Sequence, residues 1–128
     1  MSALALDLEQ SLHKVENWVE ENHYKGYEPF DALTSFWRPL TFGNSFAERV
    51  FLQAVRQSPL NIRPLLGVKP HDSAKARAYM ASGFLQRFKF NKKQIYKEKA
   101  IQCLDWLMQH KSPGYTNFCW GNQFDWTN

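Results

Sequence analysis

Hydrophobic residues recur at three- and four-residue steps in four stretches of the chain, which is the spacing of one face of an α-helix. In the first stretch these positions are Leu8, Leu12, Val15, Trp18 and Val19. The spacing predicts long helices over residues 4–22, 45–57, 73–89 and 92–110. No stretch alternates apolar and polar residues as a half-buried strand does. We therefore expect an all-α fold of antiparallel helical hairpins, in a single domain over residues 1–128.

Residues that begin or end helices lie at these boundaries. Ser58-Pro59 is expected to end the second helix, because proline lacks a backbone donor and disfavours helix at the residue before it. Asp72 or Ser73 is expected to cap the third helix, since a short polar side chain can accept bonds from the first free N–H groups. The long connections that remain are residues 24–44, 59–71 and 115–126.

The order of the helices predicts which connections meet. If neighbouring helices run antiparallel, residues 59–71 and the tail after the fourth helix lie at one end of the bundle. Residues 24–44 then lie at the opposite end, unless a short extra helix within them reverses the order. Aromatic faces with a cation, an imidazole and a carboxylate are a usual lining for a sugar site. The candidate binding residues brought together in this way are Arg63, His71, Trp120, Asp125 and Trp126.

The tail is rich in aromatic residues, and two interpretations of it stay open. Trp120 and Trp126 are equally consistent with platforms for sugar rings and with a hydrophobic plug over the helix ends. Asp125 is the candidate acid or base, but it is the one carboxylate in a loop where glycoside hydrolysis usually needs two. A structural role for Asp125, for example as a partner of Arg63, is therefore preferred. Glu28 and Asp31 are expected to brace a turn at the far end.

Composition excludes several classes of protein. The chain has 128 residues, and no run approaches the roughly 18 apolar residues of a membrane span. Residues 1–10 do not have the pattern of a signal peptide. Cys103 and Cys119 form no CxxC pair, and the four histidines show no metal-ligand spacing. We therefore expect a cytoplasmic protein with no metal site and no cofactor.

Charge is distributed unevenly along the chain. Residues 1–31 carry seven acidic residues against two lysines, whereas residues 69–99 carry nine basic residues against two acidic ones. The basic block could attract a nucleic acid, a sugar nucleotide or an acidic glycan. We prefer the interpretation that it pairs with the acidic first helix, because the bases fall on two separate helices and no nucleic-acid motif accompanies them.

Three motifs carry a resemblance to a known family. Residues 24–33, residues 58–69 and Cys119-Trp120-Gly121 with Phe124-Asp125-Trp126 follow one another in the order and spacing of that family. Together they resemble the amino-terminal part of the bacterial polysaccharide-biosynthesis proteins of the VpsJ type. The chain departs from the family pattern at Asn122-Gln123, where the family tends to place another aromatic residue.

The resemblance implies a fold and a pathway. It implies part of an (α/α)6 toroid, like that of the six-hairpin glycosidases, with a carbohydrate cleft formed by the loops. It also implies a role in the biosynthesis of cell-surface polysaccharide or exopolysaccharide. Four long helices make up only part of such a toroid, so we expect a truncated chain that is not catalytic alone. A partial toroid leaves apolar helix faces uncovered, which favours self-association.

Two alternatives of other classes stay open. The first is a non-catalytic helical module that binds another protein through its uncovered faces. The second, which is less favoured, is a nucleic-acid binder that uses residues 69–99; its affinity would fall steeply with salt.

Overall fold

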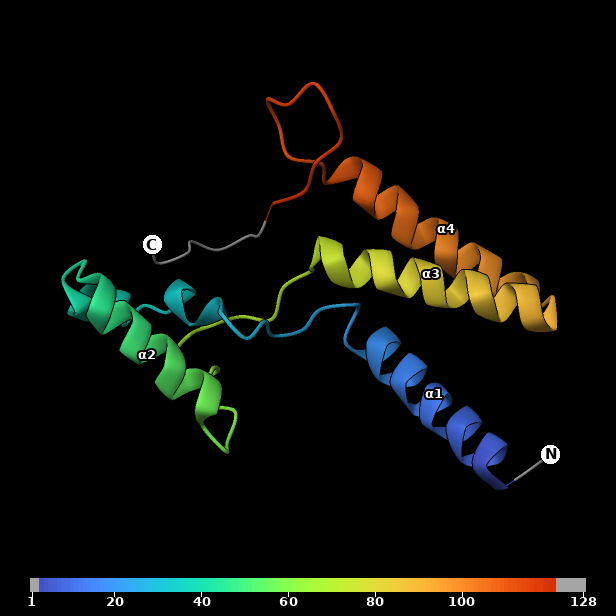
Figure 1. Ribbon diagram of the computed structural model, residues 1–128, viewed down its shortest axis with the longest axis horizontal. Coiled ribbons are helices and arrows are strands. Elements are labelled where there is room, and N and C mark those ends of the chain that lie inside the picture. The colour runs from blue at the N-terminus through green and yellow to red at the C-terminus, as the bar shows by residue number, and fades with distance from the viewer. Residues whose placement is uncertain (1–2, 122–128) are drawn as a thin grey trace.

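The computed structural model describes residues 3–121. They form an all-α structure with four long helices joined by loops (Figure 1). The prediction of an all-α protein is confirmed, and no boundary of a predicted helix is displaced by more than two residues. The only β-type pairing within the described residues is one isolated bridge. The elements in order are α1 (Ala3–Glu21), the 3-10 helices η1 (Asp31–Thr34) and η2 (Arg38–Thr41), α2 (Ser45–Gln57), α3 (Ala74–Asn91) and α4 (Gln94–Gln109).

Side-chain caps begin two of the helices. The Asn44 carboxamide accepts hydrogen bonds from the first free N–H groups of α2, those of Phe46 and Ala47, at 2.9 and 3.1 Å. At α3 the cap is Ser73, whose hydroxyl accepts from the Ala76 N–H at 3.4 Å. Of the two candidates for this cap, the structure therefore selects Ser73 and leaves the Asp72 side chain for another contact.

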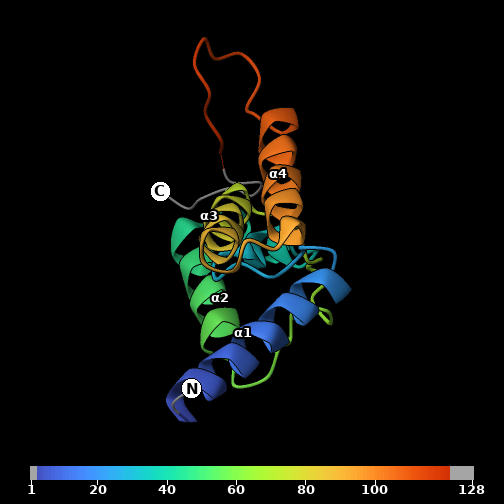
Figure 2. The same ribbon diagram turned by 90° about the vertical axis from the view of Figure 1, so that its right-hand side faces the viewer.

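The α3–α4 hairpin forms one of two cores. Both views show the two helices side by side (Figures 1 and 2), and their facing positions carry small residues, Ala81 and Ala100, that are almost fully buried. Small side chains at a helix interface let the two backbones approach, while Phe84 and Tyr96 fill the remaining space with their rings stacked at 6.4 Å. This hairpin is the antiparallel unit that the sequence predicted.

The second core lies at the other end of the molecule, where η1 packs on α2 (Figure 1). A buried ion pair joins this core to the chain that follows α2. The Asp31 carboxylate is fully buried, accepts from the Glu28 N–H at 2.9 Å, and accepts from the Arg63 guanidinium at 2.7 Å. The expectation that Asp31 braces a turn is confirmed. Arg63 also donates to the Glu28 carbonyl at 3.2 Å, so it closes the same turn from outside.

Residues 24–44 follow the exception that the sequence left open, in which a short helix within them reverses the order. They do not lie at the opposite end from residues 59–71, because Gly26 and His71 exchange two backbone hydrogen bonds of 3.1 and 2.9 Å. The physical reason is the pair of short helices, η1 and η2, which turn the chain back before α2 begins. Glu28 is therefore close to the start of α3. The antiparallel order of the helices predicts instead that it lies at the far end of the bundle.

Ion pairs hold α1 against the hairpin. Arg87 of α3 contacts Glu9 at 2.8 Å and Glu16 at 3.0 Å, and Lys99 of α4 pairs with Glu20. The Arg87 Nε is within ion-pair distance of Glu16, although no hydrogen bond forms at that nitrogen. These contacts confirm that part of the basic block pairs with the acidic first helix.

The apolar face predicted for α1 is not covered within residues 3–121. Val19 is 6% exposed, but Leu8, Val15 and Trp18 remain at least half exposed. The spacing predicted the helix correctly, and the face stays exposed because no other helix within residues 3–121 packs along the full length of α1. None of the helices within residues 3–121 has the length and hydropathy needed to cross a membrane.

The buried pair should be the most sensitive polar contact of the second core. Asp31→Asn leaves the Arg63 guanidinium without its counter-charge, and we expect it to lower the free energy of unfolding by about 3 kcal/mol in urea titrations. Glu9→Gln is the matched control, since Glu9 is exposed and Arg87 keeps Glu16. We expect the control to cost less than about 1 kcal/mol. Equal losses in the two variants would contradict the account of the second core.

Candidate functional site

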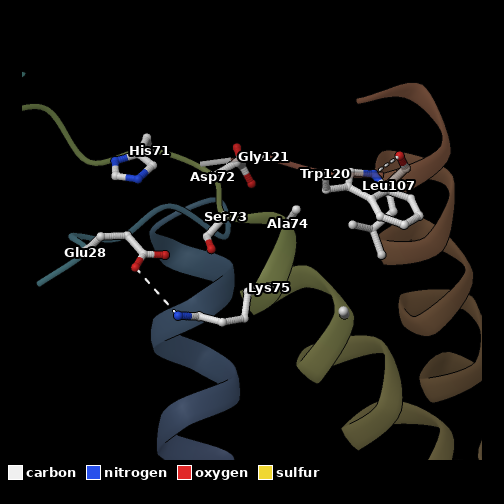
Figure 3. A pocket seen from close by; sticks show the side chains of 10 residues that line it. Glu28, His71, Asp72, Ser73, Ala74, Lys75, Leu107, Trp120 and Gly121 are labelled. Carbon is white, nitrogen blue, oxygen red and sulfur yellow. Dashed lines mark hydrogen bonds and ion pairs between the residues drawn. The ribbon is translucent and has the colours of Figure 1, made fainter. Parts of the chain in front are cut away.

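A pocket of about 270 Å³ opens at the amino-terminal end of α3 (Figure 3). Three segments far apart in the sequence line it: the turn after α1, the start of α3 with the residues just before it, and the end of α4 with the loop that follows. The side chains shown in Figure 3 that matter most for its chemistry are Glu28, His71, Asp72, Lys75 and Trp120.

Trp120 forms the aromatic wall of the pocket. Its indole Nε1 donates a hydrogen bond to the Leu107 carbonyl at the end of α4, at 2.8 Å. The ring stacks on Phe118 with centroids 6.3 Å apart, and 40% of the side chain stays exposed. Ser112 closes this loop on itself: its N–H donates to the Cys119 carbonyl, and its hydroxyl accepts from the Gly121 N–H. The polar edge of the indole is thus satisfied within the protein, while part of its apolar surface remains open.

The opposite wall is polar. Glu28 points toward Lys75 across the pocket mouth, with 3.9 Å between the carboxylate and the ammonium (Figure 3). Lys75 is mostly exposed, whereas Glu28 is largely covered. His71 lies beside Glu28, and Asp72 follows it before the helix cap. A ligand in the pocket would meet acceptors and donors on one side and an aromatic surface on the other.

Arg77 fixes the position of Asp72. Two of its nitrogens, Nε and Nη2, bind Asp72 Oδ1 at 2.9 and 2.7 Å. The guanidinium lies over the rings of Tyr24, at 4.1 Å, and Trp106, at 5.1 Å. The cation is therefore bonded to a carboxylate and covered on its faces by aromatic rings, an arrangement that suits arginine better than lysine. This contact connects the turn after α1, the start of α3 and the last turn of α4.

Burial around Arg77 raises the pKa values of two neighbouring groups, Cys103 and Tyr24. Loss of solvent raises the pKa of the Cys103 thiol, and the hydrogen bond and charge of Arg77 oppose this shift without cancelling it. Burial also raises the pKa of the Tyr24 phenol. A thiol that stays protonated is a poor nucleophile, so Cys103 acts as a small core residue.

A second pocket, of about 240 Å³, adjoins the first. Its lining shares Glu28, His71 and Ser73 with the first pocket. It adds the aromatic side chains of Trp18, Tyr24 and Tyr27. Ligand pockets of proteins typically measure about 300–1,000 Å³, so the two pockets together have room for an extended ligand.

The structure brings together some of the predicted site residues. His71 and Trp120 line the same pocket, as expected from the order of the helices. Arg63 does not line it, and the prediction that it does is wrong: its guanidinium is engaged by Asp31 in the second core. Asp125 and Trp126 lie outside the described residues.

Sequence reasoning missed Glu28, Lys75 and Arg77 as parts of this site. The five-residue spacing of Asp72 and Arg77 does not reveal whether their ion pair is buried or exposed to solvent. Glu28 was assigned to the wrong end. Its proximity to His71 could be found only by recognising the short helices in residues 24–44. Within residues 3–121, no group of three or more His, Cys, Asp and Glu side chains is arranged to hold a metal ion.

Comparisons of the chain with protein-family models, with curated proteins and with solved structures gave no match. The resemblance to the VpsJ-type proteins therefore stays a prediction from three motifs.

The raised pKa of Cys103 predicts how stability depends on pH. The unfolded thiol ionises above about pH 8.5, while the folded thiol still holds its proton, so the free energy of unfolding should fall as pH rises. Urea titrations at pH 7.5 and 9.5 should show this loss, and Cys103→Ala should reduce it. An unchanged pH dependence in Cys103→Ala would show that the thiol is not the cause.

Proposed function

We propose that this protein binds carbohydrate in the pocket at the start of α3 and is associated with the biosynthesis of cell-surface polysaccharide or exopolysaccharide. The observation that carries the binding proposal is the pairing of Trp120 with a polar wall across one pocket. Sugar rings have apolar C–H faces, which pack on aromatic rings, and hydroxyl edges, which need donors and acceptors. The pathway rests on the resemblance of the three motifs to the VpsJ-type proteins.

The polar groups suit binding better than hydrolysis. Asp72 already accepts bonds from Arg77, and Glu28 lies beside Lys75. Such carboxylates offer acceptor oxygens to sugar hydroxyls, whereas a glycosidase needs one carboxyl group that carries a proton toward the leaving oxygen. The part of the chain that the structure describes therefore supports a non-catalytic carbohydrate-binding role.

The two adjoining pockets favour a chain of sugars over a single ring. Each pocket has its own aromatic surface, Trp120 in one and Trp18 with Tyr27 in the other, and the shared residues Glu28 and His71 lie between them. A saccharide that extends across both would stack a ring at each end. Lys75 and Arg77 offset the carboxylates of Glu28 and Asp72, so the first pocket carries no net negative charge that would exclude an acidic glycan.

Trp120→Ala should weaken saccharide binding at least about tenfold, because loss of the stacking surface costs on the order of 1.4 kcal/mol. Isothermal titration with an acidic tetrasaccharide of galacturonic acid and a neutral tetrasaccharide of glucose measures this effect. The matched control is Trp37→Ala, since Trp37 is similarly exposed, at 46%, but lies beside η2. Glu28→Gln should weaken binding without removing any packing. Equal binding by all variants would refute the site.

Self-association is a second candidate property, and a specific observation favours it. A compact monomer of 15.1 kDa exposes about 7,100 Å² of surface, whereas this chain exposes 9481 Å². The excess includes large apolar side chains, among them Leu4, Phe42 and Phe46, each more than 70% exposed. We propose that a second copy covers part of this surface. Sedimentation velocity should then give twice the chain mass at micromolar concentration, and a monomer at every concentration would contradict the proposal.

A further inference from the structure

An apolar groove of about 160 Å³ lies between α1 and α3. The two helices diverge toward the amino terminus of α1 (Figure 1). The side chains along the groove are hydrophobic, with one ion pair at its edge. The lining residues are Leu12, Val15, Val19, Met80, Gly83 and Phe84, with Glu16 and Arg87 as the charged pair.

The apolar stripe of α1 continues beyond the groove. Leu4 and Leu8 precede Leu12 at intervals of four residues, so the three side chains lie along one side of the helix. Leu4 is 78% exposed and Leu8 is 60% exposed. An amphipathic helix with such a stripe gains stability only when another surface covers it. Each chain therefore carries both an open groove and an uncovered helix face.

Gly83 leaves the α3 side of the groove open. A Cβ added at this position would meet no atom within 4 Å, so the backbone of α3 is accessible there. A glycine inside a helix costs roughly 0.5–1 kcal/mol relative to alanine. Close approach of another helix would offset that cost, since backbones approach most closely where a side chain is missing.

Charge does not prevent two copies of α1 from approaching. The helix is acidic, but Glu9 and Glu16 are paired with Arg87, and Glu20 is paired with Lys99, all within one chain. These pairs reduce the repulsion that two acidic helices would otherwise have. They also leave the ion pair at the groove edge intact when an apolar helix covers the groove.

The area fits a dimer. Stable interfaces bury about 800 Å² on each partner, and obligate dimers bury about 1,000–2,500 Å² on each. The surface of this chain exceeds that of a compact monomer of its mass by an amount in the obligate range. In a two-fold symmetric dimer, α1 of each copy would lie in the groove of the other copy, so the contact is reciprocal and closed.

We propose that the groove between α1 and α3 binds the amino-terminal half of α1 from a second copy of this chain. Leu4 and Leu8 of each copy then lie over the groove of the other, close to the α3 backbone at Gly83. The inference rests on the self-association proposed above and specifies the face that carries it. The groove lies apart from the pocket that contains Trp120, and it shares only Met80 with the lining of the second, adjoining pocket.

Gly83→Glu tests the groove directly. An added Cβ meets no atom within 4 Å in the single chain, and the new carboxylate stands four residues before Arg87 on the same helix, so folding should be retained. A carboxylate in the groove should raise the dimer dissociation constant at least tenfold in sedimentation velocity experiments. Ser82→Glu is the matched control: it adds the same charge to α3 at a residue that does not line the groove, and it should leave dimerisation unchanged.

Leu8→Glu provides the reciprocal variant on the docking helix, and it should weaken the dimer to a similar degree. A wild-type chain that stays monomeric would overturn both self-association and this assignment. A dimer that survives Gly83→Glu and Leu8→Glu at unchanged affinity would overturn the groove alone and place self-association on another face. Circular dichroism of each variant reports helix content, so that a loss of dimer is separated from a loss of fold.

Discussion

The contact of Arg77 with Asp72, Tyr24 and Trp106 is the constraint on which the pocket depends. Burying a guanidinium is costly unless its charge and its donors are satisfied. Here a carboxylate satisfies the donors, and two aromatic faces replace part of the lost solvent. The four residues come from the turn after α1, the residues just before α3, α3 itself and α4, so the Arg77 cation fixes the start of α3 relative to its neighbours. The polar wall of the pocket follows from that position.

Two further contacts set the geometry around this centre. The backbone bridge between Gly26 and His71 brings the turn after α1 to the start of α3. The Asp31–Arg63 ion pair joins the same two loops, residues 24–44 and 59–71, at a second point. Glu28 lies between these contacts and thereby reaches the pocket. The site is thus a consequence of loop–loop pairing, whereas the α3–α4 hairpin supplies a rigid base and the carbonyl that anchors Trp120.

The helices could be predicted from sequence because their signals are local. Apolar spacing, the Asn44 and Ser73 caps and the break at Pro59 each act within a few residues. The approach of His71 to Trp120 could also be predicted, because it follows from the order of the helices. The partners of Arg63 and the place of Glu28 could not, since they depend on two short 3-10 helices whose periodicity is too brief to detect.

The exposed face of α1 illustrates a different limit. The stripe from Leu8 to Val19 correctly predicts a helix, but periodicity does not reveal which surface covers the stripe. In the single chain α1 is held mainly by ion pairs from α3 and α4, so its apolar residues remain available. An apolar stripe indicates burial in the assembled protein, and burial within one chain is only one way to achieve it.

The central claim is that saccharide binds against Trp120. Nuclear magnetic resonance follows this directly, because the chain has five tryptophans and each indole N–H gives its own signal. Assignment by single substitutions identifies the Trp120 and Trp37 signals. On titration with a saccharide chain, we expect the Trp120 signal to shift progressively while the Trp37 signal does not. A Trp120 signal that stays in place at saturating saccharide would contradict the account.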